Sequence, residues 1–345
     1  MPEPESSTAT PCPLSVPERS LKPAITLAVL APVIAEVLMG STRLSFIFVL
    51  IPEIMVWGLG AVTAREAVRR WRAGWVSLML LGIALGVAEE CVIQQTSLAP
   101  LVGVSPDHIY GRFFGVNWVW MLGLLVFESV WVVLVPVDFT EAIFAKRRDQ
   151  PWLTNRGMVG SGLIFIVGSF LAWYLWTQKA RPLEFHVPPY HPPMEYILAG
   201  VGAIALLVLA AFALRAIGKR SETTRTAGPA WLAAIVACLL AAPWFMVIGW
   251  AYGTMPKLPV WIAIASGLAW AAVSFLIFLW WTATPAWTEL HSIMAATGAL
   301  IASMGMGFLE GGWNRVDLIG KIILDAAALA GMVYLIRQAW RRPAA

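Results

Sequence analysis

Charged residues are scarce in this chain of 345 residues: only 13% are Asp, Glu, Lys or Arg, and only 20 are acidic. An average soluble domain carries roughly 25% charged residues, and it needs them to cover its surface. The shortage excludes a cytosolic enzyme, a nucleic-acid-binding protein and a disordered protein. The formal net charge of +4 therefore indicates no nucleic-acid partner.

Cysteines are also few, and the familiar motifs of several enzyme classes are missing. Cys12, Cys91 and Cys238 have no CxxC spacing, which argues against a disulfide framework and against a cysteine-based zinc site. The sequence contains no P-loop, no dinucleotide-binding glycine motif, no HExxH and no GxSxG. ATP hydrolysis within this chain is therefore excluded as an energy source.

Long apolar segments fill most of the sequence, in which 59% of residues are hydrophobic. Residues 1–22 are rich in Pro, Ser, Thr and Glu and predict a disordered tail. Each later apolar segment is long enough to cross a hydrocarbon core of roughly 30 Å as a helix. The sequence thus predicts an all-α polytopic bundle of about ten transmembrane helices, forming one membrane domain over residues 23–345. The segments are 24–42, 45–64, 75–97, 116–137, 157–177, 196–217, 229–252, 259–281, 288–309 and 317–337.

The basic residues outside these segments are distributed unevenly between the two sides of the membrane. With alternating crossings, 17 Lys and Arg residues fall on the side of both termini and 6 on the other side. Basic loops remain in the cytoplasm, so this asymmetry predicts that both termini are cytoplasmic. Tryptophans near segment ends, such as Trp57 and Trp118, fit an ordinary interfacial belt.

Seven ionisable residues lie well inside the predicted segments. A charge at the bilayer centre costs at least about 2.5–3.5 kcal/mol, so such residues usually face the bundle interior and pair. At about 1.5 Å per residue, they fall in one layer in the outer half of the membrane. They are Glu36, Glu53, Glu89, Glu90, Glu128, Lys321 and Asp325.

Helical spacing supports an inward-facing arrangement of this polar layer. Gly82, Gly86 and Glu90 follow at intervals of four residues, a pattern that lets another helix approach closely. Asn117 and Glu128 share a face of the fourth segment, and Lys321 and Asp325 are spaced to neutralise each other.

Three functions are compatible with these residues. Crowded carboxylates suit proton exchange or cation binding, which favours a cation- or proton-coupled transporter with the Lys321–Asp325 pair as a switch. An intramembrane hydrolase or lipid-modifying enzyme would use Glu89 or Glu90 as a base, or hold a hard divalent metal with Glu128 and Asn117. A structural or accessory protein would use the layer only to hold its helices together.

The expected partners are the lipid bilayer and a small solute or ion, with no cofactor beyond a bound proton or cation. The outer-loop residues His186 and His191 could bind a metal, although a proline-rich loop is the simpler interpretation. Glu66, Asp138 and Glu141 lie near basic residues and predict salt bridges at the cytoplasmic rim.

Four stretches resemble a family of uncharacterised bacterial polytopic membrane proteins over roughly residues 30–160. They are AREAVRRWRAGW (64–75), LLGIALGVAEE (80–90), GVNWVWML (115–122) and PVDFTEAIFAKRRDQPWL (136–153). The resemblance implies a bacterial inner-membrane protein and brings no established activity. In that family a His stands at the position of Glu128, and this departure weakens a metal-site interpretation.

The Glu89–Glu90 pair is also similar to the glutamate motif of the CAAX-processing and bacteriocin-processing (CPBP) intramembrane proteases. Those enzymes have an Arg where this chain has Gln94, and they carry two later helices with His that are not evident here. The resemblance to the protease family is therefore confined to the pair itself.

Overall fold

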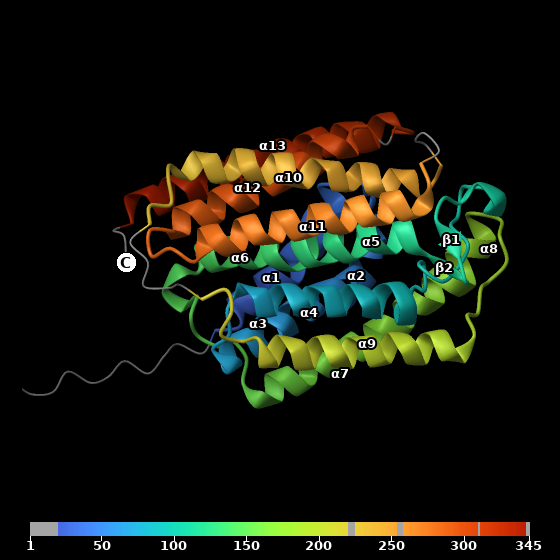
Figure 1. Ribbon diagram of the computed structural model, residues 1–345, viewed down its shortest axis with the longest axis horizontal. Coiled ribbons are helices and arrows are strands. Elements are labelled where there is room, and N and C mark those ends of the chain that lie inside the picture. The colour runs from blue at the N-terminus through green and yellow to red at the C-terminus, as the bar shows by residue number, and fades with distance from the viewer. Residues whose placement is uncertain (1–19, 220–224, 254–257, 310, 343–345) are drawn as a thin grey trace, which may run out of the picture.

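The computed structural model describes residues 20–219, 225–253, 258–309 and 311–342. Long helices lie roughly side by side along one axis, and a small hairpin sits at one end (Figure 1). The predicted all-helical polytopic bundle is confirmed. The predicted tail, 1–22, lies outside the described residues except for its last three positions.

The first half of the chain alternates α-helix with π-helical segments (η1, η3, η4, η6) and short 3₁₀ segments (η2, η5, η7). In chain order these are α1 (Lys22–Pro32), η1 (Val33–Val37), η2 (Leu44–Val49), α2 (Leu50–Glu53), η3 (Ile54–Gly58), α3 (Leu59–Trp71), α4 (Trp75–Val87), η4 (Ala88–Ile93), η5 (Pro106–His108), α5 (Trp118–Phe127), η6 (Glu128–Leu134), α6 (Val135–Ile143) and η7 (Ala145–Arg147). The antiparallel strands β1 (Arg112–Phe113) and β2 (Val116–Asn117) form the hairpin before α5.

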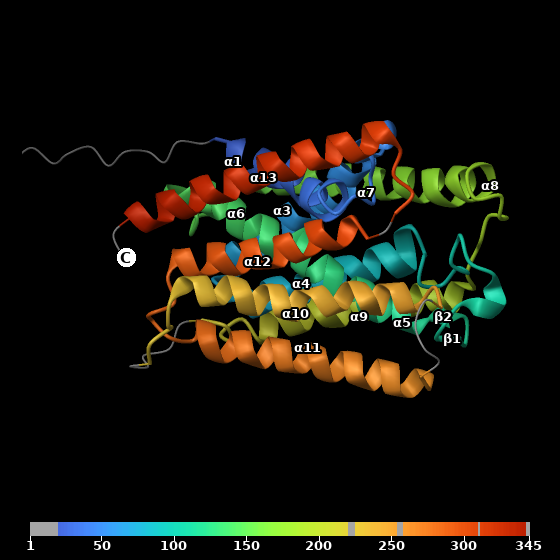
Figure 2. The ribbon, with the colours of Figure 1, turned by 90° about the horizontal axis from the view of Figure 1, so that it is seen from above.

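The second half is built from longer and more regular helices. They are α7 (Asn155–Trp173), the π-helical η8 (Tyr174–Ala180), α8 (Arg181–Leu183), α9 (Met194–Ala213), α10 (Ala230–Trp250), α11 (Val260–Thr282), α12 (Glu289–Gly307) and α13 (Arg315–Arg341). Helix α11 lies on the outside of the bundle next to α10, as Figure 2 shows.

Nine helices among the described residues are long and apolar enough to cross a membrane. They correspond to nine of the ten predicted segments. The first segment, 24–42, differs, because its helix consists of eleven residues in α1 and five in η1. At about 1.5 Å per residue this helix spans roughly 24 Å, less than a hydrocarbon core of about 30 Å.

The first helix ends early because the chain makes a buried turn after Val37. The backbone carbonyl of Glu36 accepts hydrogen bonds from the amides of Gly40 and Thr42, at 2.8 and 3.2 Å. Gly40 has a φ of 107°, a conformation that side chains disfavour, so glycine suits this position. The turn therefore terminates the helix inside the protein rather than in solvent.

Both ends of the described chain lie at the same end of the bundle, whereas the hairpin and α8 lie at the opposite end (Figures 1 and 2). The Arg147 guanidinium donates to the Ser20 carbonyl at 2.7 Å, and Arg342 donates to the Ala142 carbonyl at 3.1 Å. These bonds tie the start of α1 and the end of α13 to the α6–α7 connection.

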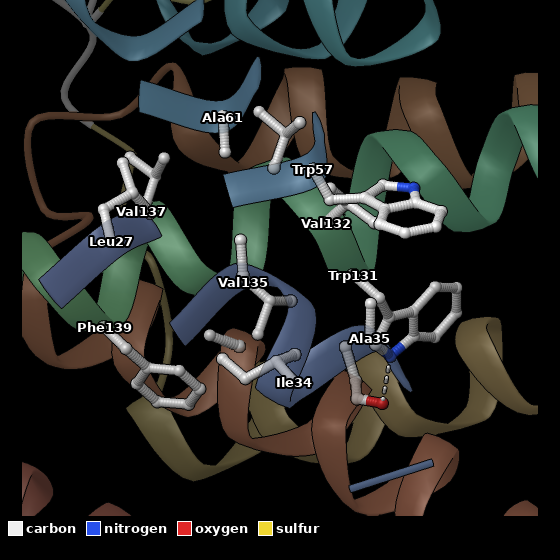
Figure 3. Close-up of a cluster of buried hydrophobic side chains, with 14 of the residues drawn as sticks. Leu27, Ile34, Ala35, Trp57, Ala61, Trp131, Val132, Val135, Val137 and Phe139 are labelled. Atoms are coloured by element: carbon white, nitrogen blue, oxygen red, sulfur yellow. Dashed lines mark hydrogen bonds between the residues drawn. The ribbon is translucent and has the colours of Figure 1, made fainter. Parts of the chain in front are cut away.

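A cluster of buried hydrophobic side chains lies where α1 and η1 meet η3, η6 and α6 (Figure 3). Trp131 is fully buried there, and its indole N–H donates to the Ala299 carbonyl on α12 at 3.0 Å. Leu27, Ile34 and Val132 are almost completely shielded around it. Small residues bring the backbones close enough for such packing, as expected between membrane helices.

Gly58 gives a direct test of this close approach. A Cβ added at Gly58 would lie 2.0 Å from the Ala28 carbonyl oxygen, so helix α1 would have to move. We expect Gly58→Ala to destabilise the protein by about 1–3 kcal/mol, as overpacking usually does. The matched control is Gly202→Ala, where nothing lies within 4 Å. Thermal unfolding in detergent should show a lower midpoint for Gly58→Ala alone, and equal midpoints would refute the close contact.

Candidate ion-binding site

All five buried or half-buried glutamates of the predicted layer lie in or directly beside π-helical segments. Glu36 is in η1, Glu89 and Glu90 are in η4, Glu128 begins η6, and Glu53 immediately precedes η3. A π turn widens the helix, redirects side chains and disturbs the regular pairing of carbonyl oxygens, and such turns are frequent at functional sites. The backbone is therefore irregular wherever the chain carries one of these carboxylates.

Glu90 is 1% exposed and accepts three hydrogen bonds on one carboxylate oxygen. The hydroxyls of Thr96 and Ser97 donate to its Oε2 at 2.7 and 2.6 Å, and the indole of Trp120 donates at 3.0 Å. Three donors on one oxygen favour the ionised form of a carboxyl group.

Glu89 directly precedes Glu90 in η4, and the two buried carboxyl groups interact with each other. Two neighbouring buried carboxyl groups are most stable when they share one proton, because two adjacent negative charges repel each other. Glu89 also interacts electrostatically with Glu128 and Glu36, so carboxylates from three helical segments lie within electrostatic range of one another. They do not gather as a metal-holding group of three within the described residues.

Glu128 packs against the glycine face of α4. A Cβ placed on Gly86 would lie 3.0 Å from the Glu128 Cβ, and one on Gly82 would lie 2.8 Å from the Ser129 Cα. The predicted glycine spacing therefore does let η6 approach α4 closely. The Trp57 indole donates to Glu128 Oε1 at 3.0 Å, while Oε2 is buried without a hydrogen-bond partner among the described residues.

Glu53 repeats this arrangement at a separate position. Its Oε1 accepts a hydrogen bond of 2.6 Å from the Thr42 hydroxyl in the turn after η1, and its Oε2 has no partner within the described ranges. Trp57 follows Glu53 by one helical turn and contacts Glu128, so η3 links the two carboxylates.

Lys321 and Asp325 form a buried ion pair of 2.9 Å on α13. The Lys321 ammonium also donates to the Leu38 carbonyl at 2.6 Å and lies 4.5 Å from the centre of the Phe308 ring. The pair therefore contacts the turn that ends the first helix, two residues beyond Glu36. It forms a second polar group next to the carboxylates, joined to them through that turn.

Asn117 has a different position from the one expected. Its amide accepts from Arg112 at 2.6 Å and donates to the carbonyls of Thr96 and Ala99 at 2.9 and 2.6 Å. These bonds occupy the amide and join the β2 strand to the segment after η4. Asn117 thus supports the residues that hold Glu90 and has no donor or acceptor aimed at Glu128.

Two tryptophans contact the buried carboxylates, which the sequence pattern does not predict. The sequence places Trp57 in the interfacial belt, but its side chain is 6% exposed and hydrogen-bonded to Glu128. The one feature of the sequence that indicates this contact is the position of Trp57 one helical turn after Glu53. Trp120, Thr96, Ser97 and Thr42 were not singled out, because hydroxyls and indoles near segment ends are common in any membrane protein.

A model described as an uncharacterized membrane protein family matches residues 25–339. The chain belongs to this family. The match confirms the expected resemblance and extends it beyond residues 30–160 to nearly the whole chain, all the carboxylates above included. No curated protein and no solved structure matches this chain.

The predicted salt bridges at the cytoplasmic rim are buried instead. In this member of the family Arg65 is 1% exposed and Glu66 is completely buried. Arg65 bonds Glu66 and Glu141, both at 3.0 Å, and its guanidinium lies 3.5 Å from the centre of the Trp152 ring. The Glu66 carboxylate also accepts from the amide of Trp152 at 2.6 Å. The α6–α7 connection folds over these charges, which the sequence pattern could not show.

Arg65→Met should therefore be strongly destabilising. It leaves Glu66 and Glu141 buried with fewer compensating donors, and breaking a buried ion pair costs about 3–5 kcal/mol. Arg156→Met, at an exposed position of α7, is the matched control. Thermal unfolding in detergent should separate the two variants clearly, and similar midpoints would show that the buried network contributes little.

The described residues show no cluster of ligands that would support a metal site at His186 and His191 in the outer loop. Within the described part of the chain, no three His, Cys, Asp or Glu side chains gather as a metal-holding group. His186 and His191 both lie at exposed positions of this loop.

Proposed function

We propose that this family member is a cation- or proton-coupled transporter in which Glu36, Glu53, Glu89, Glu90 and Glu128 hold the coupling ion. The observation that carries the proposal is that Glu36, Glu89, Glu90 and Glu128, from three π-helical segments, lie within electrostatic range of one another inside the bundle. Buried carboxylates at interrupted helices are the usual means by which membrane transporters bind ions. A purely structural polar core would not require unpartnered carboxylate oxygens.

The Glu89–Glu90 pair is suited to moving a proton. In this proposal the pair shares one proton, and the three donors on Glu90 stabilise the remaining negative charge. Glu128 lies beside the pair and can exchange charge with it without leaving the protein interior. These groups provide a relay at the core of the bundle.

The Lys321–Asp325 pair acts as a switch in this proposal. Lys321 holds the carbonyl of Leu38, in the turn whose Thr42 hydroxyl holds Glu53. A change in the charge of either polar group is therefore transmitted to the other through the five residues from Leu38 to Thr42. Interrupted helices supply such hinges in known transporter architectures.

The proposed location is the bacterial inner membrane with both termini in the cytoplasm. The shared position of the start of α1 and the end of α13, and the Arg65 and Arg147 groups around it, support this orientation. Basic residues of this kind are retained on the cytoplasmic side.

Proton movement into liposomes tests the proposal. Purified protein is reconstituted with a pH-sensitive dye inside, the membrane potential is dissipated with a membrane-permeant anion, and an external acid step is applied. Separate vesicles contain sodium, potassium or choline salts. We expect wild-type protein to carry protons faster than protein-free liposomes in at least one salt. Rates equal to protein-free vesicles in all three salts would contradict the transport proposal.

A further inference from the structure

Glu128 has one buried carboxylate oxygen that accepts no hydrogen bond from the described residues. The residue is 2% exposed, and Trp57 fixes its Oε1 at 3.0 Å, while Oε2 has no partner among the described residues. Leaving such an oxygen unsatisfied in a low-dielectric interior is costly. The contact of its side chain with Gly86 holds the carboxylate beside η4, on the side of Glu89 and Glu90.

We propose that Glu128 binds a dehydrated alkali-metal cation, Na⁺ or K⁺, at this position beside the Glu89–Glu90 pair. The inference rests on the proposed function in that it names the coupling ion for the same carboxylates. A proton would compete with the cation for the same oxygen, and the salt dependence tested below separates the two. A cation instead compensates the charge and takes several oxygen ligands together.

The surrounding backbone suits a hard cation. In η1 the Leu38 amide bonds the Val33 carbonyl at 2.9 Å, and in η4 the Gln94 amide bonds the Glu89 carbonyl at 2.9 Å, each five residues back. These wide turns displace carbonyl oxygens from the ordinary helical ladder. Carbonyl oxygens of interrupted helices coordinate Na⁺ in membrane transporters.

The charge at the site fits a monovalent ion. Glu90 already has three donors on Oε2, whereas Glu128 has one donor on Oε1 and none on Oε2 among the described residues, so Glu128 supplies a charge that is only partly compensated. One carboxylate with neutral oxygens balances one positive charge, whereas Ca²⁺ or Mg²⁺ sites usually combine more carboxylates or retain water.

Thermal unfolding of the detergent-purified protein tests the site. The midpoint is measured in sodium, potassium and choline chloride at equal ionic strength. Because a ligand that binds only the folded state stabilises it, we expect sodium or potassium to raise the midpoint by about 5 °C over choline at saturation. Equal midpoints in all three salts would overturn the proposal.

Two variants locate the effect. Glu128→Gln keeps an oxygen that can accept from Trp57 but removes the charge, so the cation-dependent shift should disappear. Glu195→Gln, at an exposed position of α9, should retain the shift. A shift that persists in Glu128→Gln would place the ion elsewhere and overturn the assignment.

Binding of radioactive sodium to the wild-type protein supplies a measurement that needs no variant. We expect saturable binding that unlabelled sodium or potassium displaces and choline does not, and non-saturable binding would contradict the site. Cation binding without proton movement in liposomes would retain the site and remove the transport proposal. Proton movement without cation binding would retain the transport proposal and overturn the cation site.

Discussion

Glu90→Gln is expected to reduce proton movement in liposomes to the level of protein-free vesicles while the protein still folds. A glutamine oxygen can accept the hydrogen bonds that Thr96, Ser97 and Trp120 now donate to Glu90 Oε2. Its amide group can donate to Glu89, so the local packing is preserved. The substitution removes only the negative charge and the shared proton, and we expect a change of about 1 kcal/mol or less in stability.

Glu90→Ala separates the two roles of this residue. It leaves the donors of Thr96, Ser97 and Trp120 buried without an acceptor, at about 1–3 kcal/mol for each unsatisfied group. We therefore expect poor recovery of folded Glu90→Ala and normal recovery of Glu90→Gln, with Glu195→Gln as the exposed control for both activity and folding. Normal proton movement by Glu90→Gln would contradict the transport account.

Lys321→Met is expected to cost about 3–5 kcal/mol in stability, because it leaves Asp325 charged and buried without its partner. Lys321 also loses its bond of 2.6 Å to the Leu38 carbonyl, which frees the turn after η1. The measurement is the midpoint of thermal unfolding in detergent. A midpoint close to that of the wild type would show that the pair is not held in its buried position.

The double variant Lys321→Met with Asp325→Asn distinguishes a structural pair from a switch. It removes both charges together, so we expect most of the stability lost in Lys321→Met to return. A switch needs the charges themselves, and the stable double variant should then fail to move protons in liposomes. A double variant with both stability and proton movement restored would assign the pair a purely structural role.

Much of the fold followed from physical regularities in the sequence. Runs of about 20 apolar residues can satisfy their backbone groups only as helices in a membrane, which explains why nine predicted segments reappear as helices among the described residues. The interval of four residues between Gly82 and Gly86 likewise anticipated the close approach of η6. Glu89, Glu90 and Glu128 lie in apolar segments, and because a carboxylate facing lipid is costly, the sequence predicts that these side chains face the interior of the bundle.

The other features of the fold and of the candidate site depend on tertiary contacts, which leave no local pattern in the sequence. The turn after Val37 is fixed by Lys321, nearly three hundred residues away in the sequence, so segment 24–42 resembled one uninterrupted span. Trp57 had the composition of an interfacial residue, and only its contact with Glu128 reveals its role. The burial of Arg65 depends on the α6–α7 connection folding over it, which a count of charges near segment ends cannot predict.

The most direct test of the central claim is proton release on cation binding. If protons and alkali cations occupy the same carboxylates, each must displace the other. The purified protein is placed in weakly buffered detergent solution, and the pH is followed while sodium, potassium or choline chloride is added. The account predicts release of about one proton per chain with sodium or potassium, none with choline, and none from Glu128→Gln. Equal pH changes in all three salts would show that these carboxylates do not exchange protons for cations.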